Sequence, residues 1–109
     1  MNERFIGWLA VVLTVLAGCS TVAAQGDASL LEKGKQAFTD QGCYGCHTIG
    51  KFGTPIAPDL SRLGAKYSVA DLASWLRDPS AQKPTAHMPR INLTEDEVRA
   101  LSVYLASLR

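Results

Sequence analysis

The residues best suited to chemistry lie together in the segment Cys43-Tyr44-Gly45-Cys46-His47. Two thiols separated by two residues can add to the two vinyl groups along one edge of a porphyrin, because this spacing lets both sulfurs reach the edge. The imidazole of His47, next in sequence, can then bind the iron through a ring nitrogen. The pattern is the attachment signature of c-type haem. It predicts one covalent haem c, with thioether bonds to Cys43 and Cys46 and with His47 as an axial ligand.

Two other kinds of site use the same residue types. A thioredoxin-like redox pair would have a strand before the motif and a helix after it. Here a helical pattern precedes Cys43, and a loop containing Gly and Pro follows His47. A zinc site would need two further ligands, and His87 is the other histidine of the chain. The order of the elements favours haem, and both alternatives stay open.

A second iron ligand can be argued by elimination. If the N-terminal segment is removed, Met88 is the methionine that remains. A lone methionine is usually a core residue, but Met88 lies between His87 and Pro89, away from any helical stripe. We therefore expect Met88 to be the sixth ligand of the iron. His87 is the alternative ligand, and an open sixth position is the third hypothesis.

The N-terminal segment has the pattern of a bacterial export signal. Residues 5–17 are uncharged, follow Arg4 and precede small residues. The segment Leu16-Ala17-Gly18-Cys19 resembles the lipobox of bacterial lipoproteins, which implies that residues 1–18 form a signal peptide and that Cys19 carries a thioether-linked diacylglycerol. Cys19 is also the cysteine left over by haem attachment, and such a cysteine in an exported protein needs an explanation.

Two other fates of this segment stay open. Cleavage after Ala24 would give a soluble periplasmic protein, and an uncleaved run from Phe5 to Ala24 would be barely long enough to span a bilayer. In the lipobox interpretation, residues 19–28 form the lipidated cysteine and a tether. Residues 29–109 then form the folded domain. The protein is expected to be exported and held by lipid at the extracytoplasmic, periplasmic side of the membrane.

Length and composition limit the remaining classes. The chain has 109 residues, 47% of them apolar and 19% charged, with a net charge of +1. It is one domain at most. The nearly neutral balance excludes a strongly basic nucleic-acid binder, so we expect no nucleic-acid partner.

Three helical patterns position the candidate residues, and no stretch alternates convincingly as a strand would. The first helix is expected to start at a cap, Asp27 or Ser29, and to stop at Gly42. One of its faces carries Leu30, Leu31, Gly34, Ala37 and Phe38.

Capping boxes mark the starts of the other two helices. Ser68 pairs with Asp71 in the second helix, which Asp78-Pro79 ends, and Thr94 pairs with Glu97 in the third. The apolar stripes are Val69, Leu72, Trp75 and Leu76 in the second helix and Val98, Leu101, Leu105 and Leu108 in the third.

Two long loops, residues 48–67 and 78–93, connect these helices. Loops of this length in a small domain are usually functional, and something must fill the space beneath them. The sequence therefore predicts an all-α fold, with three main helices and long loops around one covalent haem.

The motif, the helices and the Met-Pro loop together resemble class I cytochromes c over nearly all of residues 29–109. The resemblance implies that the first and last helices cross, with Gly34, Phe38 and Tyr104 at the contact. These three would also suit an ordinary core.

The same resemblance implies surroundings for the haem. In Ala57-Pro58-Asp59-Leu60, the Pro58 carbonyl would accept a hydrogen bond from Nδ1–H of His47 and fix its tautomer. Leu60 would pack on the haem. Trp75 is expected to be a core residue, or else to donate its indole N–H to a haem propionate.

The function that follows is single-electron transfer between redox partners at the membrane surface. Axial ligation by His and Met leaves no vacant position for a substrate. We therefore expect no enzyme activity and no small-molecule substrate, with membrane or exported redox proteins as electron donor and acceptor. One alternative is a haem c subunit of a larger quinol-oxidising or oxidase-type complex. Another is a haem sensor or peroxidase with an open sixth site.

Overall fold

A computed structural model describes residues 22–109, so the predicted signal peptide 1–18 and Cys19 lie outside the described residues. The chain forms a small, mostly helical domain, as predicted. The elements in order are α1 (Val22–Asp40), the 3-10 turn η1 (Cys43–Gly45), β1 (Thr48–Ile49), β2 (Phe52–Gly53), the 3-10 turn η2 (Leu63–Ala65), α2 (Val69–Arg77), α3 (Pro79–Gln82) and α4 (Glu95–Ala106). None of the helices in this described part is long and apolar enough to cross a membrane.

Helix α1 begins earlier than its predicted cap. It starts at Val22, so the predicted start at Asp27 or Ser29 is wrong, and residues 22–28, which the prediction assigned to the tether, are helical. Alanine and glutamine here favour a helix, and the single Gly26 weakens it without ending it. The other end agrees with the prediction, because Gly42 takes a φ of 73°, a conformation that favours glycine.

The predicted helix starts at Ser68 and Thr94 are confirmed. The Ser68 hydroxyl accepts from the backbone N–H of Asp71 at 3.1 Å, and the Asp71 carboxylate accepts from the N–H of Ser68 at 3.1 Å. Thr94 and Glu97 make the same reciprocal pair at 3.1 and 2.8 Å. Each box satisfies two backbone donors that a helix start would otherwise leave without partners.

The two predicted loops contain short elements of their own. Strands β1 and β2 pair as an antiparallel hairpin, with Thr48 opposite Gly53 and Ile49 opposite Phe52. The sequence did not predict this hairpin, because two-residue strands are too short to alternate. In the second loop, Pro79 begins the one-turn helix α3 directly after α2 ends.

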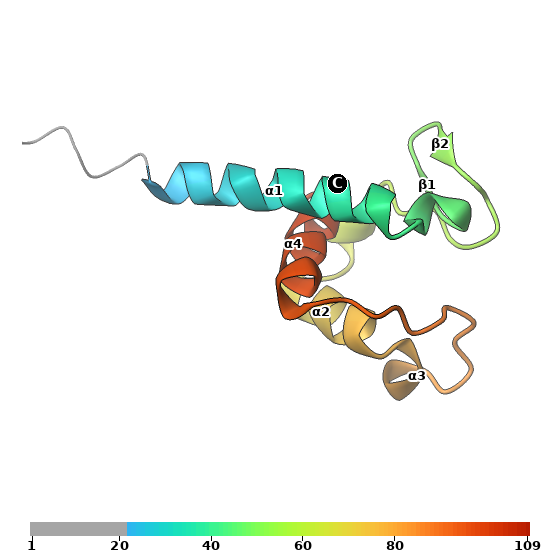
Figure 1. The fold of residues 1–109 in the computed structure, drawn as a ribbon. Coiled ribbons are helices and arrows are strands. Elements are labelled where there is room, and N and C mark those ends of the chain that lie inside the picture. Colours follow the sequence, from blue (N-terminus) through green and yellow to red (C-terminus); the bar gives the residue numbers. More distant parts are fainter. Residues whose placement is uncertain (1–21) are drawn as a thin grey trace, which may run out of the picture.

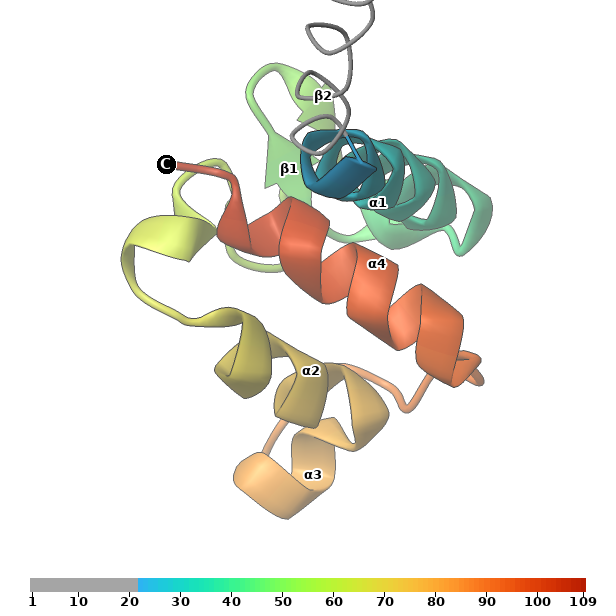
Figure 2. The same ribbon diagram turned by 90° about the vertical axis from the view of Figure 1, so that its left-hand side faces the viewer.

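Helix α4 is the middle layer of the fold. Figures 1 and 2 show α1 crossing one side of α4 and α2 lying along the other. Val69, expected in the apolar stripe of α2, is instead 43% exposed at the first position of that helix. The core between the layers consists of Ala37, Phe38, Leu60, Leu72, Leu76, Val98, Leu101 and Leu105.

The crossing of α1 and α4 is close because of Gly34. A Cβ atom at this position would collide with the carbonyl oxygen of Ala100 and with the Cβ of Tyr104. One turn further along α1, the rings of Phe38 and Tyr104 meet edge-on with centroids 6.1 Å apart. The contact implied by the resemblance is therefore present, and it fixes the end of α1 from which the cysteine motif continues.

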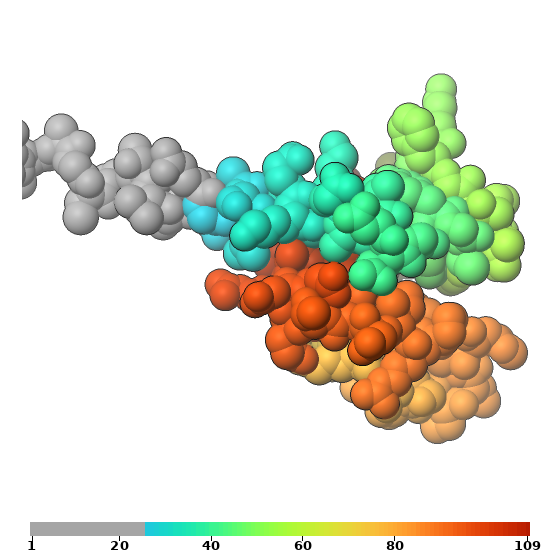
Figure 3. Space-filling model, viewed as in Figure 1, coloured from blue at the N-terminus to red at the C-terminus, as the bar shows by residue number. Residues whose placement is uncertain are grey.

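Both loops lie on the same side of these layers. Figure 1 shows the hairpin at the end of α1 and the segment after α3 projecting in the same direction, and Figure 3 shows their surfaces, green and orange, on that side. The fold thus brings the cysteine motif and the Met88 segment to one side of the molecule.

Gly34→Ala should destabilise the protein by about 1–3 kcal/mol, because the added methyl group must push α1 away from α4. Denaturant unfolding of the holoprotein measures this change. Gly26→Ala is the matched control in the same helix, since a Cβ there meets nothing within 4 Å. It should raise stability by up to about 1 kcal/mol. Equal effects of the two substitutions would contradict the close crossing.

Candidate functional site

The cysteine motif forms a tight turn immediately after α1. The N–H of Gly45 donates to the carbonyl of Gly42 at 2.9 Å, and the N–H of His47 donates to the carbonyl of Cys43 at 3.0 Å. Cys43 is half-buried and Cys46 is exposed, and both thiols are free of disulfides. The turn therefore presents two free thiols and an imidazole within five residues.

The chain after the motif folds back along it. Backbone N–H groups of Thr54, Ala57 and Leu60 donate to the carbonyls of His47, Cys46 and Thr48 at 3.2, 2.7 and 2.9 Å. Gly53 permits this return, because it has a φ of 106° and a Cβ atom there would collide with the His47 carbonyl. These bonds fix the backbone on both sides of the imidazole.

The imidazole of His47 is held in one tautomer. Its Nδ1 lies 2.8 Å from the carbonyl oxygen of Pro58. A carbonyl can only accept, so Nδ1 must carry the proton, and the lone pair of Nε2 is left to bind a metal. This is the contact that the resemblance implied for Pro58. Leu60, two residues on, is buried in the core.

A network of side chains that the sequence analysis missed lies beside this bond. One carboxylate oxygen of Asp59 accepts from the hydroxyls of Thr48 and Ser61 at 2.8 and 2.9 Å. The Ser61 oxygen in turn accepts from the N–H of Gly50 at 2.8 Å. The two hydroxyl donors lower the pKa of Asp59. No local pattern signals this network, because two of its three bonds join residues that are eleven positions apart in the sequence.

Met88 has a specific partner as well. The indole N–H of Trp75, on α2, donates to the Met88 sulfur at 3.1 Å. Both side chains are half-buried, whereas the neighbouring His87 is exposed. Trp75 is therefore not a plain core residue, and the sequence did not predict its hydrogen bond to Met88. A signal was available, since a partly buried indole N–H usually finds an acceptor, and a thioether sulfur is a weak one.

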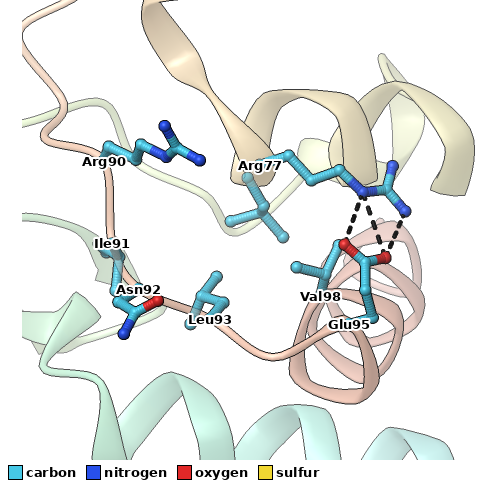
Figure 4. A pocket seen from close by; sticks show the side chains of 8 residues that line it. Arg77, Arg90, Ile91, Asn92, Leu93, Glu95 and Val98 are labelled. Atoms are coloured by element: carbon cyan, nitrogen blue, oxygen red, sulfur yellow. Dashed lines mark hydrogen bonds and ion pairs between the residues drawn. The ribbon is translucent and has the colours of Figure 1, made fainter.

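An ion pair joins the two ends of the Met88 loop. Arg77, the last residue of α2, donates through Nε and Nη2 to the carboxylate of Glu95, the first residue of α4, with a shortest distance of 2.9 Å (Figure 4). The pair lowers the pKa of Glu95. It borders a cavity of about 180 Å³ that Arg90 and Leu93 also line. The ion pair thus joins the end of α2 to the start of α4, on either side of the loop that carries Met88 (residues 78–93).

This donor set fits haem c. Two thiols can form thioethers, and a neutral imidazole with a free Nε2 and a thioether sulfur are both known axial ligands of haem iron. Within residues 22–109, no three His, Cys, Asp or Glu side chains come together as a metal site. Burial raises the pKa of the Cys43 thiol, whereas the reactive cysteine of a redox pair has a lowered pKa. A helix, not a strand, precedes the motif.

Comparisons with known proteins point to the same chemistry. Cytochrome c oxidase subunit 2 of Alkalihalophilus pseudofirmus is 31% identical over 101 residues, which cover 84% of this chain and 30% of that protein. A nitric oxide reductase subunit of Paracoccus denitrificans is 32% identical over 82 residues, covering 67% and 55%. The CcoP subunit of the Cbb3-type cytochrome c oxidase of Helicobacter pylori is 28% identical over 107 residues, covering 92% and 35%.

The chain thus spans between about a third and about half of the length of these relatives. The family model described as Cytochrome c matches residues 31–109, which include the motif, both loops and all of α4. The chain therefore belongs to the cytochrome c family, and its cofactor is covalently bound haem c.

Proposed function

We propose that the protein is a single-electron carrier whose haem is attached to Cys43 and Cys46 and whose iron is bound by His47 and Met88. The observation that carries this proposal is the hydrogen bond between Nδ1 of His47 and the Pro58 carbonyl. This bond commits one ring nitrogen to the protein and leaves the other for the iron.

The residues around the site serve this function by holding both ligands still. Haem c supplies reversible one-electron chemistry when bound. Pro58 orients the imidazole, and Trp75 orients the Met88 sulfur, which keeps a further lone pair for the iron. A thioether ligand raises the reduction potential. If His47 and Met88 both bound the iron, no position would remain for a substrate, so we expect no enzyme activity of the chain by itself.

The electron donor and acceptor are exported or membrane redox proteins. The net charge of +1 offers little long-range steering, so docking relies on apolar contact. Two apolar side chains of the first loop, Phe52 and Ile56, are 73% and 74% exposed. The residue after Ile56 bonds to the Cys46 carbonyl at 2.7 Å, so this apolar surface adjoins the attachment turn.

A lipid on Cys19 would hold the carrier at the periplasmic face of the membrane. Residues 1–18 are then the signal peptide, and residues 19–28 carry the lipid and tether the domain to it. Anchoring confines a carrier close to membrane partners and raises its effective concentration there. The alternative of a soluble periplasmic carrier has the same haem site.

A second candidate function is a haem c subunit of a larger complex. The relatives named above are called subunits of cytochrome c oxidases and of nitric oxide reductase, and this favours the candidate. The same ligands and the same fold would serve both functions. Isolation from native membranes under mild detergent separates the two functions, since a carrier elutes alone and a subunit elutes with a larger complex.

A sensor or peroxidase with an open sixth site is disfavoured by the contact between Trp75 and Met88.

Haem should remain bound to the denatured protein through both cysteines. Mass spectrometry of the denatured chain should give the polypeptide mass plus one haem, and the variant Cys43→Ala/Cys46→Ala should give the polypeptide mass alone. Haem that extracts from the wild-type protein into acidified organic solvent would show that the attachment is not covalent.

Met88→Ala should abolish the charge-transfer band from sulfur to ferric iron and lower the midpoint potential, because a thioether stabilises ferrous iron. Absorption spectra and redox titration measure both effects. His87→Ala is the matched control one residue away and should leave both unchanged. A wild-type protein that lacks this band, and whose spectrum changes in His87→Ala but not in Met88→Ala, would show that His87 is the ligand.

Cys19→Ser should abolish acylation while leaving the apolar export segment intact. Wild-type protein should partition with membranes and carry acyl groups on its N-terminal cysteine, as read by mass spectrometry. The variant should carry none. A wild-type protein recovered in the soluble periplasmic fraction and beginning at Gln25 would contradict the lipid anchor and favour cleavage after Ala24.

A further inference from the structure

Three contacts join the segment that carries His47 to the segment that carries Pro58, in one continuous register. His47 meets Pro58, Thr48 meets Asp59, and the N–H of Gly50 meets Ser61. The partners in each contact are eleven residues apart, at 2.8 Å in all three cases. The imidazole contact is therefore the first of three successive cross-links between the same two segments.

Asp59 is the centre of the other two cross-links. Its Oδ1 accepts from Thr48 directly, and it also accepts from Ser61, whose oxygen receives the Gly50 N–H. Hydrogen bonds to an ionised carboxylate are shorter and stronger than neutral ones. The hydroxyl donors lower the pKa of Asp59, so it is ionised at neutral pH.

We propose that Asp59, acting through Thr48, is a positioning residue for His47 that holds the Pro58 carbonyl against the imidazole Nδ1–H. The proposal rests on the proposed role of His47 as an iron ligand. Thr48 follows His47 and Asp59 follows Pro58, so the Thr48–Asp59 bond closes a small ring that contains the imidazole contact. Within this ring, the Pro58 carbonyl cannot move away from Nδ1 without breaking a charge-assisted hydrogen bond.

The consequence for the iron follows from the basicity of the imidazole. A carbonyl that accepts from Nδ1–H increases electron donation from Nε2 to a bound metal. Stronger donation stabilises the ferric state. Loss of the Asp59 contact should weaken the contact to Pro58, raise the midpoint potential and let the Nδ1 proton exchange with solvent more readily.

The test compares variants of the holoprotein by the exchange rate of the His47 Nδ1 proton, measured by NMR of the reduced protein, and by the midpoint potential. Thr48→Val keeps the shape and the charge but removes the hydroxyl. It should accelerate exchange by about tenfold, the effect of losing one charge-assisted hydrogen bond, and should raise the potential. Asp59→Ala should do the same.

Two further variants separate position from charge. Asp59→Asn keeps an acceptor oxygen and should exchange more slowly than Asp59→Ala. Asp96→Asn removes an exposed carboxylate on α4 and should leave the exchange rate at the wild-type value. If the potential rises in Asp59→Asn but neither readout changes in Thr48→Val, the carboxylate acts only through its charge and the proposal is overturned.

The NMR spectrum of the wild-type protein separates the proposed ligand role of His47 from the proposed positioning role of Asp59. Wild-type protein without resonances of an iron-bound His47 ring would overturn the proposed ligand and this inference together. If those resonances are present and Thr48→Val exchanges at the wild-type rate, the ligand assignment holds and the positioning role of Asp59 is wrong.

Discussion

The close crossing of α1 over α4 is the constraint on which the other features depend. Gly34 lets the two backbones approach, and the Phe38 and Tyr104 rings fill the next turn. Because α1 runs directly into the cysteine turn, this crossing places both thiols and His47 relative to the core. The opposite face of α4 supports α2, which carries Trp75 toward Met88. One helix thus sets the positions of both sides of the site.

The two candidate iron ligands are held in different ways. His47 lies in a short segment cross-linked to the chain around Pro58 by hydrogen bonds from backbone and side chains. Met88 lies in a longer loop, which is held by the indole of Trp75 and by the ion pair between Arg77 and Glu95 at its base. That ion pair is largely exposed, and exposed pairs stabilise only slightly. The segment that carries Met88 is therefore held by fewer contacts than the segment that carries His47, as suits the weaker of the two candidate ligands.

Features with a local physical cause could be predicted from the sequence. The capping boxes at Ser68 and Thr94, the stop at Gly42 and the motif itself depend on neighbouring residues, and the structure contains each of the three helix signals. The predicted start of α1 at Asp27 or Ser29 was wrong, because a cap residue marks a helix start only when the preceding chain is not helical. The Asp59 network could not be predicted, because loop geometry brings its partners together. For Trp75 the sequence signals only that a partly buried indole N–H needs an acceptor, and the fold of the loop that carries Met88 decides which acceptor it finds. The relatives then supplied the family, and with it the cofactor.

In the proposed site, the iron has one nitrogen ligand from His47 and one sulfur ligand from Met88. X-ray absorption at the iron edge of the purified reduced protein measures this coordination most directly. We expect a six-coordinate iron with a single sulfur among its ligands and nitrogen in all other positions, and we expect the Met88→Ala protein to lack the sulfur contribution. A wild-type protein whose iron has no sulfur ligand, or has five ligands in total, would contradict this coordination.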